Sequence, residues 1–360
     1  MGEQVLNSRK NFFIMTLSLM TCLISLICLK TPPVHAEGAG FTVAAVTPPN
    51  QFNKNASYFD LKVTPGQAQD ISVQIQNLTS AQKKVTVYPN TGYTSNAGVE
   101  AYDKNKLNRL SRAPFLLSEI LGRPQKIILA PHETKTLTFS LKMPQQKFHG
   151  ILEGALYFLD DQTSAAQQTN QKGMTIRNRY ALALGIVLRE DTQTPVAPKM
   201  KMNKISAGIQ DTANFSAATK VNLENTRPAM IKRLQLVGEI SRRAGSKVLY
   251  RSTQKNLGMA PNSNFDYSIN WRNDSMKVGR YHMHLTATSG KYKWVFDRNF
   301  NINRAEASNV NKKANIERNW TWLWILLGAL LVLLIFLLAF FIGRRSANKK
   351  KANSSHTEKD

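Results

Sequence analysis

Short stretches in which every second residue is apolar recur along most of this chain. In ISVQIQN the apolar side chains are Ile71, Val73 and Ile75, and the same two-residue period recurs in KVTVYP (84–89), TLTFSLKM (136–143), RLQLVGEI (233–240) and YHMHLTA (281–287). This period places the apolar side chains on one face of a β-strand, so the stretches predict antiparallel sheets with one buried face. About seven such strands make one sandwich, so we predict an all-β fold class with two immunoglobulin-like β-sandwich domains in tandem.

Three of these strands are expected to begin after the same kind of turn, found in VTPGQ (63–67), LAPHE (129–133) and MAPNS (259–263). Proline presets the first central position of such a turn, and Gly66 or Asn262 tolerates a left-handed backbone at the next one. After the third turn we expect the alternating residues to face a core: Phe265, Tyr267, Ile269 and Trp271. The segment APFLLSEILG (113–122) is the one short helix predicted outside the chain ends.

Residues 1–36 have the layout of a secretory signal peptide. A basic start is followed by an apolar stretch and by PVHAEG, which offers a small-residue cleavage site after Ala36. An uncleaved anchor helix is the alternative. Both cysteines of the chain, Cys22 and Cys28, lie in this segment, so the remainder can form no disulfide.

Residues 320–343 contain no charged side chain. At 1.5 Å per residue such a helix exceeds the ~30 Å apolar thickness of a bilayer, so we predict one transmembrane helix. The basic residues 344–360 then form a cytoplasmic tail, and the rest of the chain lies outside, on the cell-wall side of the cell membrane. The residues predicted at the two membrane interfaces are Trp320, Trp322, Trp324, Arg344 and Arg345.

The segments between the two ends are expected to form two domains and a linker. The boundary between the domains is left open between about 160 and 200, because both DDQTSAAQQTNQKG and DTQTPVAPKMKM have the composition of a connection. The predicted organisation is a first β-sandwich at 37–190, a second at 191–305 and a juxtamembrane linker at 306–319.

Positive charge is concentrated in the second half of the chain. The formal net charge is +25, and residues 161–319 carry 26 basic against 11 acidic side chains, whereas residues 37–160 carry 13 against 9. This excess of positive charge favours anionic partners: wall polymers, lipid head groups, acidic matrix glycans or host proteins. A basic surface that only keeps the domain soluble and near an anionic wall is the alternative. Nucleic acid is not expected, because the chain carries export signals and no recognisable nucleic-acid fold.

Residues that could carry chemistry are few. His282 and His284 would share one face of a strand and could begin a metal site, but the usual three or four ligands are not found. Glu119 and Glu153 could form a carboxylate pair, although nothing in the sequence brings them together. No G-x-S-x-G or H-E-x-x-H motif occurs. We therefore predict no catalytic residue, no metal, no cofactor and no enzymatic activity, and the ligand-binding residues are unknown.

Six segments, in this order and spacing, resemble the WxL-interacting protein family of Gram-positive cell-surface proteins, as do the apolar C-terminal helix and its basic tail. The segments are FTVAAVTPPNQFNKNASYFDLKVTPGQAQDISVQIQN (41–77), KFHGILEGALYF (147–158), RYALALGIVLRE (179–190), NLGMAPNSNFDYSINW (256–271), VGRYHMHLTAT (278–288) and KWVFDRNFNI (293–302). The resemblance implies that the first sandwich binds peptidoglycan and the second binds host proteins. It also implies complexes with secreted proteins that carry a WxL domain.

The leading hypothesis is therefore a non-enzymatic, membrane-anchored adhesion or scaffold protein of the cell surface. Two alternatives remain open. The chain could be a surface assembly factor or sensor that passes binding outside the cell to a cytoplasmic partner. It could also be a cell-wall hydrolase.

Overall fold

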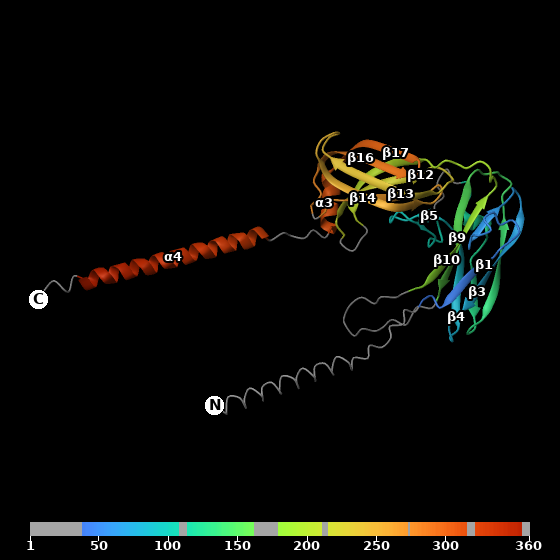
Figure 1. The fold of residues 1–360 in the computed structure, drawn as a ribbon, viewed down its shortest axis with the longest axis horizontal. Coiled ribbons are helices and arrows are strands. Elements are labelled where there is room, and N and C mark those ends of the chain that lie inside the picture. Colours follow the sequence, from blue (N-terminus) through green and yellow to red (C-terminus); the bar gives the residue numbers. More distant parts are fainter. Residues whose placement is uncertain are drawn as a thin grey trace, which may run out of the picture. The chain divides into compact units, whose positions relative to one another are not determined.

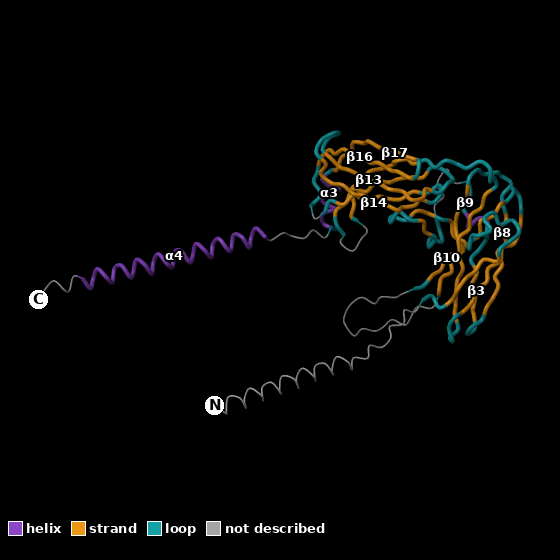
Figure 2. Tube along the Cα trace, viewed as in Figure 1, coloured by secondary structure: helices purple, strands orange, loops and turns teal. Residues whose placement is uncertain are grey.

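The computed structural model describes residues 38–107, 114–161, 179–210, 215–272, 274–314 and 321–354. Strands dominate the described residues, and the predicted all-β class is confirmed (Figure 1, Figure 2). The predicted signal peptide, residues 1–36, lies outside the described residues. Contacts divide the chain into two compact units. Unit 1 is Met1–Thr91, Leu117–Lys147 and Gly154–Leu188, and unit 2 is Gly92–Leu116, Phe148–Glu153 and Arg189–Asp360.

Unit 1 contains a three-stranded sheet, ordered β1-β3-β8, and a five-stranded sheet, ordered β2-β10-β9-β4-β7. The alternation seen in the sequence decides which face of these strands is buried. In β3, Ile71, Val73 and Ile75 are all at most 1% exposed, and Ile71 lies opposite the buried Phe139 of β8. The strands are β1 (Phe41–Val46), β2 (Phe59–Lys62), β3 (Ala68–Asn77), β4 (Lys83–Thr91), β7 (Gln125–Leu129), β8 (Thr134–Lys142), β9 (Ile151–Asp160) and β10 (Ala181–Arg189).

Unit 2 is built from a three-stranded sheet, β11-β12-β15, and a four-stranded sheet, β14-β13-β16-β17. Buried apolar residues of both sheets form one core cluster, so the two sheets pack against each other. A small two-stranded sheet, β5-β6, also belongs to this unit. The strands are β5 (Tyr93–Thr94), β6 (Glu100–Ala101), β11 (Met200–Ile209), β12 (Ala217–Asn225), β13 (Ile231–Ser241), β14 (Val248–Met259), β15 (Asn264–Asn270), β16 (Gly279–Ser289) and β17 (Tyr292–Ile302).

The aromatic residues of β15 and the position after it lie in the core of unit 2, as predicted. Phe265 is 2% exposed, and Tyr267, Ile269 and Trp271 are 0% exposed. Their polar atoms are satisfied inside the core: the Tyr267 hydroxyl donates to the Ser252 carbonyl over 2.7 Å, and the Trp271 Nε1 donates to the Thr219 hydroxyl over 2.9 Å. These aromatics are therefore packing residues with satisfied polar ends rather than a ligand platform.

The three proline turns share one backbone feature. The residue after the proline has a positive φ in each case: 71° at Gly66, 57° at His132 and 47° at Asn262. A proline followed by a left-handed residue is the pattern of a type II turn and not of a type I turn, so the left-handed backbone predicted at Gly66 and Asn262 is confirmed. His132 occupies the same position without the conformational freedom of glycine.

One buried asparagine in each unit fastens the end of a strand to such a turn. In unit 1, Asn77 ends β3, and its side-chain amide donates to the carbonyls of Ala81 (2.7 Å) and Ala130 (2.8 Å). In unit 2, Asn225 ends β12 and donates to the carbonyls of Ala229 (2.6 Å) and Ala260 (3.0 Å). Ala130 and Ala260 directly precede the prolines of their turns, and both asparagines are 0% exposed. The same polar contact is thus built twice.

Two helices depart from the sequence expectations. The predicted helix at 113–122 is reduced to α2 (Leu117–Ile120), and the following Gly122 has φ 82°. The second helix, α3 (Arg304–Lys313), was not predicted, and it overlaps the first part of the predicted linker at 306–319. Asn303 and Glu306 form a capping box at its start, and Ala307 and Val310 are buried, which stabilises the helix.

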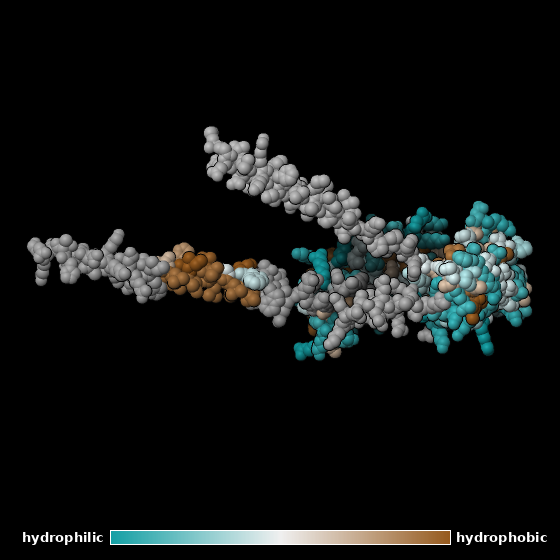
Figure 3. All heavy atoms as spheres, turned by 90° about the horizontal axis from the view of Figure 1, so that it is seen from below, coloured by the Kyte–Doolittle hydropathy of each residue, from teal (hydrophilic) through white to brown (hydrophobic). Residues whose placement is uncertain are grey.

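The segment predicted to span the membrane lies in α4 (Thr321–Ser354). Its large apolar side chains from Trp324 to Leu338 are all exposed, and they appear as the brown part of this helix in Figure 3. Over the described residues, however, no helix combines the length and hydropathy needed to cross a membrane. Of the predicted interface residues, Trp324 is 71% exposed, whereas the side chains of Trp320, Trp322, Arg344 and Arg345 lie outside the described part.

We predict that Asn77→Asp destabilises unit 1 by about 3 kcal/mol or more, because it places a buried carboxylate against two carbonyl oxygens and removes two donors. Asn55→Asp is the matched control, since Asn55 is exposed and such surface changes stay within about 0.5 kcal/mol. The measurement is chemical denaturation of both variants. Equal stabilities of the two variants would contradict a structural role for the Asn77 amide.

Candidate functional site

A pocket of about 570 Å³ lies at one end of the four-stranded sheet of unit 2. Three strand ends meet there, because antiparallel pairing sets Ser241 at the end of β13 opposite His282 near the start of β16, and Gly279 opposite Ile302 at the end of β17. Three arginines line the pocket: Arg242, Arg243 and Arg280. None of the described residues that line it is acidic. The pocket is therefore lined by positively charged side chains and, over the part of the chain that the structure describes, by no negatively charged one.

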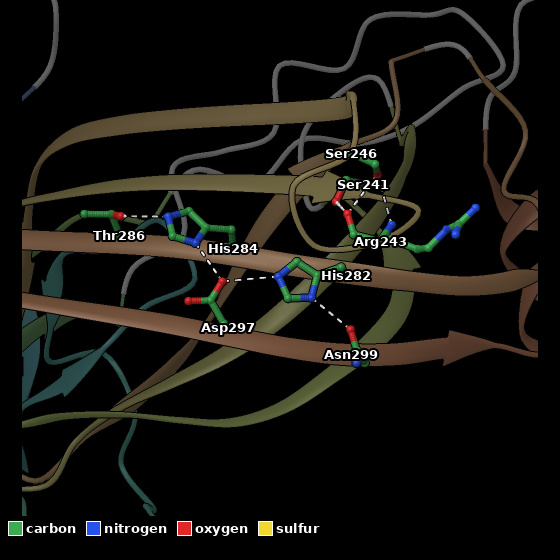
Figure 4. Close-up of polar contacts among 8 residues, drawn as sticks. All are labelled: Ser241, Arg243, Ser246, His282, His284, Thr286, Asp297 and Asn299. Atoms are coloured by element: carbon green, nitrogen blue, oxygen red, sulfur yellow. Dashed lines mark hydrogen bonds and ion pairs between the residues drawn. The ribbon is translucent and has the colours of Figure 1, made fainter.

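The turn after β13 is held in shape by its serines (Figure 4). The Ser241 and Ser246 hydroxyls each donate to the Arg243 carbonyl over 2.8 Å, and the Arg243 N–H donates to the Ser246 hydroxyl over 3.1 Å. Gly245 has φ 71° and allows the chain to reverse. The two arginines at the beginning of this turn therefore project from a backbone fixed by local hydrogen bonds.

Arg242 lies over the ring of Tyr281, with its guanidinium carbon 4.4 Å from the ring centroid. A side chain at Gly279 would collide with this guanidinium, because a Cβ there would lie 2.6 Å from Arg242 Nη1. Tyr281 in turn stacks on Phe300, with centroids 5.6 Å apart. The cation–π contact orients Arg242, and the two rings supply an apolar wall beside the charge.

His282 sits next to this pocket with both ring nitrogens against oxygen atoms (Figure 4). Its Nδ1 is 2.8 Å from Asn299 Oδ1, and its Nε2 is 3.2 Å from Asp297 Oδ1. A neutral imidazole can donate from one nitrogen only, whereas the imidazolium donates to both oxygens. These two contacts fix the orientation of the His282 ring against β17.

His284, two residues along the same strand face, contacts the same carboxylate through Nδ1 at 2.8 Å. The hydrogen bond from His284, and next that from His282, hold the pKa of Asp297 below its ordinary value. The two histidines thus converge on one oxygen of Asp297 and not on an open point between the three side chains. Within the described residues, no group of three or more histidine, cysteine or carboxylate side chains is arranged to hold a metal ion.

Thr286, His284 and Asp297 lie in the order of a hydrolase triad. The Thr286 hydroxyl is 3.4 Å from His284 Nε2, and Asp297 is on the other ring nitrogen. A working triad also needs backbone or side-chain donors for the oxyanion. β16 is paired on both sides, Thr286 lying opposite Val237 and Val295, so its backbone groups belong to the two ladders. We interpret these side chains as a polar cross-strand network.

A second unusual group in unit 2 is a buried carboxylate. Glu153 is 3% exposed; its Oε1 accepts a hydrogen bond from the Tyr102 hydroxyl over 2.6 Å, and among the described residues its Oε2 has no partner. Burial, and next the carboxylate of Glu100, raise the pKa of Glu153 to about 7, although the Tyr102 hydrogen bond and Lys232 act in the opposite direction. Glu153 is therefore protonated in the fold at mildly acidic pH.

Sequence reasoning found some of these residues and missed others. It placed His282 and His284 on one polar strand face and singled out SRRAGSK (241–247), which supplies two of the pocket arginines. It did not find Arg280, Asn299 or Asp297, because only strand pairing brings them to the same place. The carboxylate that raises the pKa of Glu153 is Glu100, which sequence reasoning did not single out.

Two family models match the chain in tandem. Residues 41–160 match the peptidoglycan binding domain of WxL Interacting Protein, and residues 171–312 match its host binding domain. The chain belongs to the WxL-interacting protein family. The two matched domains make it a cell-surface binding protein, and the resemblance recognised in the sequence is confirmed. No match was found among curated proteins.

Three of the solved structures that match are distantly similar to this member of the WxL-interacting protein family. A chaperone–tip adhesin complex of CFA/I fimbriae biogenesis is 13% identical, covering 72% of this chain and 98% of that one, with a TM-score of 0.29. The class 5 fimbriae chaperone CfaA is 14% identical, covering 72% and 98%, with a TM-score of 0.27. The Pseudomonas aeruginosa CupB2 chaperone is 10% identical, covering 66% and 95%, with a TM-score of 0.23. Such low scores carry no argument about fold or function.

We predict that the stability of unit 2 falls as pH rises from 4.5, the ordinary value for Glu153, to about 7. Over this window folded Glu153 keeps a proton that the unfolded chain has released, so raising the pH favours unfolding. Glu153→Gln should reduce that slope in melting temperatures measured between about pH 5 and about pH 8, and the remainder comes from Glu100, whose pKa is also raised by burial. Glu239→Gln, which breaks only the exposed pair with Arg251, should keep it. An unchanged slope in Glu153→Gln would show that another group titrates.

Proposed function

We propose that this chain is a non-enzymatic, membrane-anchored binding protein of the cell surface. Residues 41–160 attach to peptidoglycan, and residues 171–312 bind host proteins. The chain also binds surface proteins that carry a WxL domain. The tandem match to the peptidoglycan-binding and host-binding models is the observation that carries the proposal. The proposal also includes export directed by residues 1–36 and an immunoglobulin-like topology of both units.

The membrane anchor is proposed from the exposed surface of α4. All its large apolar residues from Trp324 to Leu338 are exposed, and they surround the helix, with no polar face. A helix that is apolar all round needs an apolar environment on every side, which a bilayer supplies. The basic residues after 343 place the following segment in the cytoplasm by the positive-inside rule.

The proposal of a binding protein without catalysis is supported by the chemistry of the described histidines. His282 and His284 are engaged with Asp297 and Asn299 inside a sheet, and the strand of Thr286 is paired on both sides, so its backbone groups belong to the two ladders. Binding through shape, charge and hydrogen bonds requires no nucleophile, general base or oxyanion donors. A wall hydrolase would require all three.

Peptidoglycan attachment is predicted to depend on unit 1 and not on unit 2. The full chain in detergent should co-sediment with purified peptidoglycan. Asn77→Asp should abolish this by unfolding unit 1, and Asn225→Asp, which breaks the matching contact in unit 2, should preserve it. Loss of sedimentation in Asn225→Asp with unit 1 still folded would overturn this division of labour. Release of soluble wall fragments would instead indicate a hydrolase.

Membrane anchoring is predicted to require the apolar surface in the middle of α4. The double variant Leu331→Lys, Leu334→Lys should leave the membrane pellet after a carbonate wash, because each lysine at a helix centre costs about 3 kcal/mol of insertion free energy. The matched variant Leu331→Ile, Leu334→Ile should stay in the pellet. Immunoblots of the two fractions measure the distribution. Retention of the lysine variant would argue against a spanning helix.

A further inference from the structure

We propose that the pocket between the β13–β14 turn and the ends of β16 and β17 is a binding site for sulfate or phosphate esters carried on a carbohydrate-type polymer. This proposal rests on the proposed function as a surface binding protein and assigns the ligand chemistry of one site in unit 2. The shared chemistry is a tetrahedral oxyanion ester. A sulfated glycan and a polyol-phosphate wall polymer are its two sources.

The first argument is uncompensated charge. Arg242, Arg243 and Arg280 line one pocket, and within the described residues none of the three forms an ion pair. By contrast, Arg251, a strand residue of the same sheet, pairs with Glu239 over 3.1 Å. Three arginines that are unpaired in one concavity produce a local positive potential, which attracts anions more strongly than the same charges spread over a flat surface.

The second argument is the chemistry of the donors. A guanidinium presents a planar fork of N–H groups that matches the oxygens of phosphate-like anions two at a time. Asn299 Oδ1 is taken by His282, which leaves its amide group as a further donor on the pocket wall. Several donors can thus bind one tetrahedral anion from different directions.

The third argument is preorganisation. Arg242 is held over Tyr281, and the Ser241 and Ser246 hydroxyls hold the backbone of the turn that carries Arg243 (Figure 4). Fixing these groups before binding reduces the conformational entropy that a ligand must remove. Phe300, stacked on Tyr281, gives the pocket an apolar wall on which the C–H face of a sugar ring can lie. This combination of charge and aromatic surface favours a charged sugar over a bare ion or an acidic peptide.

The test uses the full chain in detergent and two fluorescent probes: a heparin oligosaccharide and a polyglycerol-phosphate oligomer. Fluorescence anisotropy at about 50 mM and about 200 mM salt gives the affinity and its salt dependence. We expect at least one probe to bind, and the double variant Arg243→Gln, Arg280→Gln to lose about tenfold or more of that affinity. Both side chains are exposed, so the variant should fold.

The matched control is Lys291→Gln, Lys293→Gln, which removes the same charge at the opposite end of the β16–β17 hairpin. It should change affinity by less than about twofold. Ala244→Glu, which places a carboxylate at the pocket, is a second test variant and should weaken binding as the arginine changes do. Equal losses in the arginine and lysine variants would overturn the proposal, because they would show only diffuse charge attraction.

The remaining outcomes are also decisive. Binding of heparin alone identifies a sulfated glycan, and binding of polyglycerol phosphate alone identifies a wall polymer; either result supports the proposal. Absence of binding to both probes, or equally tight binding of labelled poly-glutamate, overturns it. Peptidoglycan sedimentation of the same variants separates this site from the proposed function, because the arginine variant should still sediment if unit 1 attaches to the wall.

Discussion

Both units depend on the burial of alternate side chains of their strands, with no covalent bond to hold the sheets together. Both cysteines lie at positions 22 and 28, so apolar packing must supply the stability that disulfides provide in many exported domains. Each unit adds one fully buried asparagine, Asn77 or Asn225, which fastens a strand end to the proline turn before another strand. An unmade hydrogen bond would be costly at these positions, so this contact specifies where the turn must sit.

The candidate ligand site follows from the same construction. Once antiparallel pairing sets His282 opposite Ser241 and Asn299, the turn after β13 and the end of β17 must meet at the beginning of β16. The sheet buries its apolar face and leaves the other available, so polar and basic residues gather where the strands end. The rigid sheet thereby positions arginines that come from distant parts of the sequence, which is how a binding protein can present a fixed charged surface without a catalytic centre.

Individual residues show how far sequence reasoning could go. Phe265, Tyr267, Ile269 and Trp271 were assigned to the core correctly, since a two-residue period allows only one buried face. The segment 179–190, one of those that resemble the family, contains β10. The helix α3 overlaps the linker expected at 306–319 and was not foreseen, because it gains its stability from burying Ala307 and Val310 and from its capping box. The environment of Glu153 could not be foreseen, because Glu100 and Lys232 reach it only through the fold.

The sequence by itself determined the all-β class, the buried faces of its strands, the turn positions and the membership of the WxL-interacting protein family. These properties follow from the local periodicity of the sequence, from its proline turns and from the order of its segments. Only the tertiary structure decided which charged groups become neighbours. Strand register brings Arg280 to Arg242 and Asp297 to two histidines, and burial gives Glu153 a pKa of about 7. Electrostatic interactions depend on distance and on exclusion of water, and neither is encoded in the spacing of residues along the chain.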